Sequence, residues 1–177
     1  KWSQKAFEAI DNNEYSIARQ YIKAGLVEDP TNTKLLALDD QLSLLLEIVG
    51  NRFIKEENGK RLLFESIHLY MNGDYQRSVE IAEYLSRKNS AVQVHRYKVL
   101  LEESTQCVSK YKGKDIVQSN FELSEKSLQS NNVEASIDAL KNVLYFEPKD
   151  FDALKQLGDN FFTLNEADLA IEAWERA

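Results

Sequence analysis

"FDALKQLGDNFFTLNEADLAIEAWERA" (residues 151–177) contains two amphipathic segments separated by a polar turn signal, Asn165-Glu166-Ala167. Apolar and small residues recur at intervals of three and four positions on both sides of that turn: Leu154, Leu157, Gly158 and Phe161 before it, Ala170, Trp174 and Ala177 after it. This spacing places each set on one face of a helix. The stretch therefore predicts two helices joined by a short turn.

The same arrangement occurs at three earlier places in the chain. The earlier turn signals are Asn13-Glu14-Tyr15, Asn72-Gly73-Asp74-Tyr75 and Asn131-Asn132-Val133. Each is followed by a small residue and, four positions later, by an apolar or helix-forming one: Ala18 and Ile22, Ser78 and Ala82, Ser136 and Leu140. The repetition predicts several copies of one helical unit.

This pattern resembles the tetratricopeptide repeat, whose 34-residue period carries two helices. The copies lie at about 1–32, 59–92, 117–150 and 151–177, and Pro30 and Pro148 close two of them. The resemblance implies antiparallel helix pairs stacked into a superhelix. The expected fold class is therefore all-α, an α-solenoid of about ten helices forming one domain over residues 1–177, irregular in its middle.

Packing explains why small residues follow the turns. Small side chains such as Ala18, Ser78, Ser136 and Ala170 allow two helices to approach closely, and larger residues one turn away fill the space beside them. A single helix pair cannot bury its whole apolar face. Neighbouring pairs are therefore expected to bury one another, which gives an extended stack.

Two segments, 33–58 and 93–116, interrupt the repeat. Each begins with a predicted helix, at 33–49 and 92–108, and ends in a charged stretch. The helix at 33–49 is apolar on more than one side and is expected to be buried on more than one side. Two interpretations are open: each segment is a degenerate repeat with a shortened second helix, or each adds one extra helix.

Composition restricts the possible partners. Residues 117–177 carry five Lys or Arg and twelve Asp or Glu, a net charge of 5 − 12 = −7, which argues against general nucleic-acid binding. The basic run "KYKGK" (110–114) is interpreted as a solvated loop or as a docking point for an acidic segment. The most apolar run, 35–50, is too short and too charged to span a bilayer, so no membrane insertion is expected.

The sequence favours a non-enzymatic protein without cofactor or metal. His68 and His95 are the two histidines and Cys107 is the single cysteine, so the usual zinc ligand sets are unavailable. Cys107 is expected on the apolar side of a helix as a buried, inert thiol. The six glycines form no phosphate-binding loop. The chain lacks an initiating methionine and starts within a helical repeat, which suggests a piece of a longer protein; it predicts no compartment.

The resemblance implies a concave groove, lined by the first helix of each pair, that receives a peptide or helix from a partner protein. Residues carried over to groove positions are Phe7, Leu63, Ile67, Tyr70, Tyr97, Leu101, Phe121, Leu128, Lys155 and Phe162. The alternative for any one of them is that it closes the gap between neighbouring helices. The expected function is a protein-interaction scaffold; the alternatives are a regulatory or targeting module of a larger enzyme, and a module that self-associates through end helices.

Overall fold

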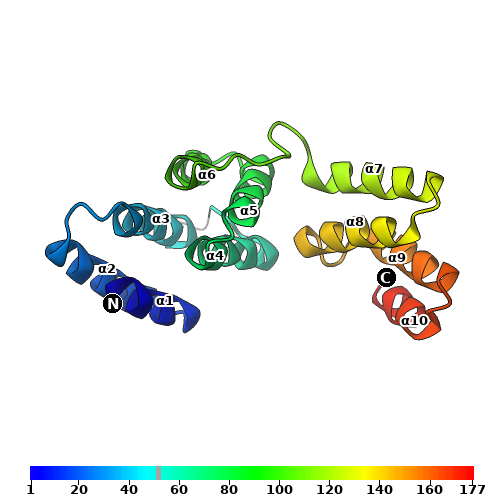
Figure 1. Ribbon diagram of the computed structural model, residues 1–177, viewed down its shortest axis with the longest axis horizontal. Helices are drawn as coiled ribbons and strands as arrows, with labels where there is room; N and C mark the ends of the chain where they lie inside the picture. The colour runs from blue at the N-terminus through cyan, green and yellow to red at the C-terminus, as the bar shows by residue number, and fades with distance from the viewer. Residues whose placement is uncertain (51–52) are drawn as a thin grey trace. The chain divides into compact units, whose positions relative to one another are not determined.

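The computed structural model describes residues 1–50 and 53–177. Within these residues the protein is all-α, with ten helices and no strand (Figure 1). The described residues divide into two compact units, Lys1–Lys112 and Gly113–Ala177. The all-α prediction is therefore confirmed, whereas the repeat boundaries within a single 1–177 domain stay a prediction.

The first unit, Lys1–Lys112, contains six helices. They are α1 (Trp2–Asp11), α2 (Tyr15–Glu28), α3 (Thr33–Gly50), α4 (Glu57–Asn72), α5 (Tyr75–Lys88) and α6 (Val92–Thr105). Most helices that follow each other in sequence pack together, as α1 with α2 and α4 with α5. In addition, α1 contacts α4 and α3 contacts α6, so contacts in this unit extend beyond neighbours in sequence.

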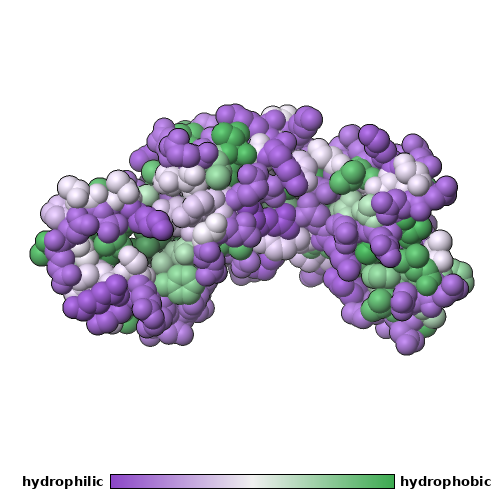
Figure 2. Space-filling view, in the orientation of Figure 1, coloured by the Kyte–Doolittle hydropathy of each residue, from purple (hydrophilic) through white to green (hydrophobic). Residues whose placement is uncertain are grey.

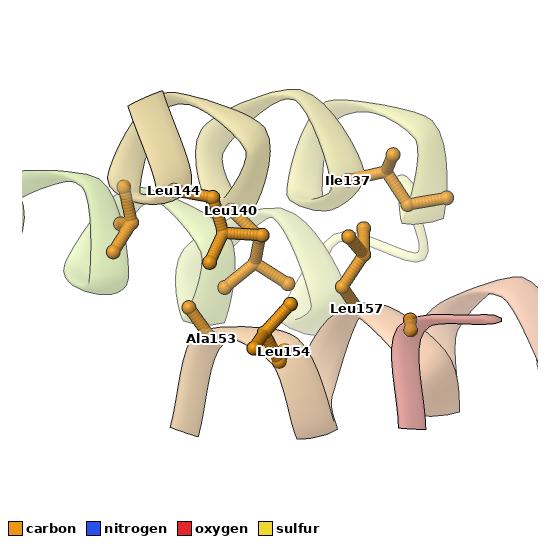
Figure 3. Packing of buried hydrophobic residues seen from close by; sticks show 8 residues of the cluster. Ile137, Leu140, Leu144, Ala153, Leu154 and Leu157 are labelled. Carbon is orange, nitrogen blue, oxygen red and sulfur yellow. The ribbon is translucent and has the colours of Figure 1, made fainter. Parts of the chain in front are cut away.

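The second unit, Gly113–Ala177, contains four helices. They are α7 (Ile116–Gln129), α8 (Val133–Phe146), α9 (Phe151–Thr163) and α10 (Ala167–Arg176). Each packs mainly against its neighbours in sequence. The core of this unit lies between α8 and α9, with Leu140, Leu154 and Leu157 at its centre (Figure 3).

Asparagine and glycine in the four turn signals adopt a backbone conformation that other residues disfavour. The left-handed residues at these turns are Asn13 (φ 59°), Gly73 (φ 84°), Asn131 (φ 55°) and Asn165 (φ 62°). Asn and Gly tolerate positive φ better than other residues do. In all four turns the next backbone N–H donates to the carbonyl five residues earlier, as from Glu14 to Ala9 at 2.7 Å. The repeated turn signal therefore has one structural cause, a helix ending in a left-handed residue.

Small residues occupy the helix crossings, as the sequence predicts. Ala18, Ser78, Ser136 and Ala170 are each 0 % exposed. The close approach is tightest around Gly158, where a Cβ would overlap the indole of Trp174. Gly25 is similar, because a Cβ there would lie 2.9 Å from Cβ of Trp2.

The serines at these crossings also form buried hydrogen bonds. Between α4 and α5, the Ser66 hydroxyl donates to the Ser78 carbonyl at 3.1 Å, and the Ser78 hydroxyl donates to the Ser66 carbonyl at 2.7 Å. Between α7 and α8, the hydroxyls of Ser124 and Ser136 lie 2.7 Å apart. Buried hydroxyls without partners would destabilise the fold, so pairing them makes serine acceptable where alanine or glycine is usual.

A third helix in each unit donates one more hydrogen bond to its serine pair. Tyr97 of α6 is fully buried and donates from its hydroxyl to Oγ of Ser66 at 3.0 Å. Asn160 of α9 donates from Nδ2 to Oγ of Ser136 at 2.8 Å. Because a hydrogen bond needs defined distance and direction, these two bonds fix the position of α6 and α9 along the helix pairs they cover.

We expect Tyr97→Phe to lower the free energy of unfolding by about 1 kcal/mol at neutral pH, since it removes one buried hydrogen bond. Burial raises the pKa of the Tyr97 phenol. The unfolded chain therefore loses this proton first, and stability falls as the pH rises past about 10. Tyr97→Phe removes that contribution, so urea unfolding should show a smaller loss of stability between pH of about 9 and 11 in the variant. An equal loss in both proteins would contradict the assignment.

Each of the two segments that interrupt the repeat contributes one helix, α3 or α6, among the described residues. Neither 53–56 nor 106–115 contains a second helix, and residues 51 and 52 lie outside the described residues. α3 contacts α2, α4 and α6, which agrees with the prediction that it is buried on more than one side. The described residues therefore favour an extra helix over a shortened repeat in both places.

The predicted extent of α6 and the placement of Cys107 are wrong. α6 ends at Thr105, because Gln106 is left-handed (φ 56°) and the Thr105 hydroxyl accepts the backbone N–H of Cys107 at 3.2 Å. Cys107 therefore lies after the helix, and it is half-buried. Polar side chains at the end of α6 stop the helix three residues before the predicted end at residue 108. The spacing of apolar residues contains no information about this kind of stop.

Candidate partner-binding groove

The unit Gly113–Ala177 has a surface depression between α7 and α9. Its volume is about 210 Å³. The residues that line it are Gln118, Phe121, Glu122, Glu125 and Leu128 of α7, with Gln156 of α9. Phe121 and Leu128 are two of the residues that the sequence places in a partner-binding groove, and the structure brings them to the same depression.

Helix geometry explains how α7 presents these side chains. Residues 118, 121, 125 and 128 are spaced by three and four, so they follow one another along one face. The start of the helix is fixed by Asp115, whose carboxylate accepts the backbone N–H groups of Val117 at 2.9 Å and Gln118 at 3.2 Å. Asp150 caps α9 in the same way by accepting from Ala153 at 2.8 Å. Both helices that form the groove thus begin at defined residues.

The apolar side chains of the depression differ in how firmly they are held. Phe121 is half-buried and packs against the core cluster between α8 and α9. Leu128 is 39 % exposed, near the end of α7. Phe121 is therefore oriented by the core, whereas Leu128 is free to contact another molecule with much of its surface.

The two predicted groove residues on α9 are also on the surface. Phe162 is 63 % exposed and its ring centroid lies 6.0 Å from that of Trp174. Lys155 is exposed one residue before Gln156. The indole N–H of Trp174 donates to the carboxylate of Asp159 at 3.1 Å, which holds the indole against α9. On the face shown in Figure 2, apolar residues gather where α9 and α10 lie.

The predicted groove residues of the other unit are mostly enclosed. Leu63, Ile67, Tyr97 and Leu101 are 0 % exposed and Tyr70 is 8 % exposed. In this structure these five side chains fill space between the helices of Lys1–Lys112, which is the alternative that the sequence left open for any single residue. Phe7 of α1 is half-buried. Exposed candidates for partner contact are therefore concentrated in Gly113–Ala177.

Four residues that line the depression are not among the ten predicted groove residues. Gln118 and Glu125 lie on the predicted groove face, whereas Glu122 and Gln156 follow Phe121 and Lys155 directly in sequence. Glu122 accepts a hydrogen bond from Nε2 of Gln118 at 3.2 Å, which turns it along the groove face. Apolar periodicity contains no signal for such polar residues, because it selects only the side chains that avoid water.

A second depression lies between α3 and α6 and has a volume of about 480 Å³. Leu44, Val99 and Leu100 contribute apolar surface there, and Asp40 and Arg96 are among its charged residues. Lys110 of "KYKGK" makes a contact within Lys1–Lys112: its Nζ lies 4.0 Å from Oε1 of Glu80.

Residues with catalytic or metal-binding chemistry do not gather at either depression. Across the described residues, His, Cys, Asp and Glu nowhere form a group of three or more that could hold a metal ion. Nδ1 of His68 lies 2.8 Å from the carboxylate of Asp11, so this histidine joins α4 to α1. Within residues 1–50 and 53–177, every helix is too short or too polar to serve as a membrane span.

Comparison of the chain with models of protein families, with curated proteins and with solved structures gave no match.

Proposed function

We propose that the protein is a non-catalytic interaction scaffold, built from antiparallel helix pairs in a tetratricopeptide-like α-solenoid. It binds a peptide or helix of a partner protein along α7 and α9. The observation that carries this proposal is the 210 Å³ depression, where Phe121 and Leu128 meet Gln118, Glu125 and Gln156. Anchoring apolar side chains surrounded by polar ones is the usual composition of a peptide-binding surface.

The internal repetition of the chain supports the proposed solenoid. Four helix crossings carry small buried residues twelve positions apart: Ala6 and Ala18, Ser66 and Ser78, Ser124 and Ser136, Gly158 and Ala170. Four similar left-handed turns connect these helices. A solenoid built from such units exposes the same face of successive first helices, which provides an elongated surface for an extended or helical partner.

We expect Phe121→Ala and Leu128→Ala each to weaken partner binding by about 1 to 3 kcal/mol, roughly 5- to 150-fold in Kd, because each removes an apolar anchor. The partner would be isolated by affinity capture with mass spectrometry from the native source, and its affinity measured by calorimetry. Circular dichroism would check that helicity is retained.

Leu123→Ala is the matched control for this experiment. Leu123 lies on α7, is 49 % exposed and does not line the 210 Å³ depression. Its truncation removes the same apolar side chain as Leu128→Ala but should leave the affinity unchanged. Equal affinities for all three variants and the parent would contradict the proposed groove.

A further inference from the structure

The charged residues that line the 210 Å³ depression have one sign. Glu122 and Glu125 are its two ionised lining residues, and none of the residues lining it is Lys or Arg. Both carboxylates are exposed on α7. Lys126 and Lys155, the nearest lysines in sequence, do not line it. A segment that contacts Phe121 and Leu128 must therefore place its neighbouring side chains close to two carboxylates.

The unit that contains the depression adds to this local charge. Residues 113–177 contain six Lys or Arg and thirteen Asp or Glu, a net charge of 6 − 13 = −7, which equals the net charge of the whole chain. The first unit is therefore close to neutral overall. A partner of opposite charge associates faster with this unit, and a partner of like charge is repelled. Both effects become smaller as the salt concentration rises.

We propose that the partner segment is a basic amphipathic helix, with apolar side chains for Phe121 and Leu128 and Lys or Arg for Glu122 and Glu125. This inference rests on the proposed binding function of the same groove. The order of the groove residues carries it: along α7 the two carboxylates, Glu122 and Glu125, lie between the two apolar side chains, Phe121 and Leu128. A helix with one apolar stripe and cationic flanks offers the complementary order.

The test uses the whole chain and two synthetic amphipathic peptides about four helical turns long. Both peptides carry the same leucine stripe; one has lysine and the other glutamate at the flanking positions. Fluorescence anisotropy would measure Kd at low and at high salt. We expect the lysine peptide to bind at least about 10-fold more tightly at low salt, with a smaller difference at high salt.

Charge reversal then locates the effect. Glu122→Lys combined with Glu125→Lys should abolish or invert the preference for the lysine peptide. The matched control combines Asp138→Lys with Glu172→Lys, which makes the same change in net charge at exposed positions of α8 and α10 outside the depression. The control should keep the preference. Circular dichroism would confirm the helical content of both double variants.

Three outcomes would overturn the inference. They are a failure of the lysine peptide to bind, an equal affinity for both peptides, and a preference lost equally in the two double variants. Phe121→Ala separates the inference from the proposed function beneath it. If both peptides bind with equal affinity and Phe121→Ala weakens that binding, the proposed groove stands and only the preference for a basic helix is wrong. If neither the peptide charge nor Phe121→Ala changes the affinity, the proposed groove is wrong as well.

Discussion

Leu140→Ala is expected to lower the free energy of unfolding by about 3 to 4 kcal/mol, within the range of about 2 to 5 kcal/mol typical of buried leucines. Leu140 of α8 is 0 % exposed and belongs to the cluster that also contains Leu154 and Leu157 of α9 (Figure 3). The substitution removes this contact and leaves a cavity between two helices. α8 also packs against α7, and α9 also packs against α10. Neither helix can therefore move far enough to fill the cavity.

Leu123→Ala, the same substitution at a residue that is 49 % exposed, is the control and should change stability by less than about 0.5 kcal/mol. Urea unfolding followed by circular dichroism would compare the two variants. Because the described residues form two compact units, the unfolding curve of each protein should first be tested for a single transition. Similar losses in both variants would mean that the core of this unit is not between α8 and α9.

Lys98→Met is expected to lower the free energy of unfolding by about 3 to 5 kcal/mol, because it removes the ammonium group that lies against a nearly buried carboxylate. Nζ of Lys98 in α6 lies 2.7 Å from Oε2 of Glu83 in α5, with side chains 12 % and 5 % exposed. Methionine has a similar length and no charge, so the loss would come from electrostatics more than from packing. Thermal unfolding at neutral pH would measure the change.

Lys60→Met is the control for this substitution. Lys60 lies 3.0 Å from Glu57, and these side chains are 30 % and 90 % exposed, so its loss should cost less than about 1 kcal/mol. A further variant that combines Lys98→Met with Glu83→Met should recover much of the stability, because the buried carboxylate is removed together with the ammonium group. If Lys98→Met costs no more than Lys60→Met, the buried pair contributes little to the packing of α6 on α5.

Local sequence signals gave a good account of the helices and turns. Apolar spacing predicts the paired segments on either side of each turn, and residues such as Asn131 and Asn165 mark the points where the chain becomes left-handed. The error at α6 has a local cause as well, since polar side chains at Thr105 and Gln106 end the helix while apolar residues continue in the sequence. An error of this kind shifts a helix end by only a few residues, because only residues next to the helix end cause it.

The candidate groove was only partly predictable. Phe121, Leu128 and Phe162 are on the surface, while Ile67 and Tyr97, which were also placed at groove positions, are buried. Their spacing along the helix is the same in both groups, so periodicity cannot separate them. What separates them is whether another helix covers that face. Whether the exposed residues bind a partner stays a prediction for the experiments above.

By itself, the sequence determined that this protein is all-α, where its turns lie and which small residues stand at the helix crossings. Only the tertiary structure decided that α3 contacts α6, that Tyr97 and Asn160 extend the buried serine pairs, and that the exposed candidate residues gather in Gly113–Ala177. The reason is the range of the interactions. Helix periodicity and turn conformation depend on residues a few positions apart, whereas covering an apolar face depends on segments distant in sequence.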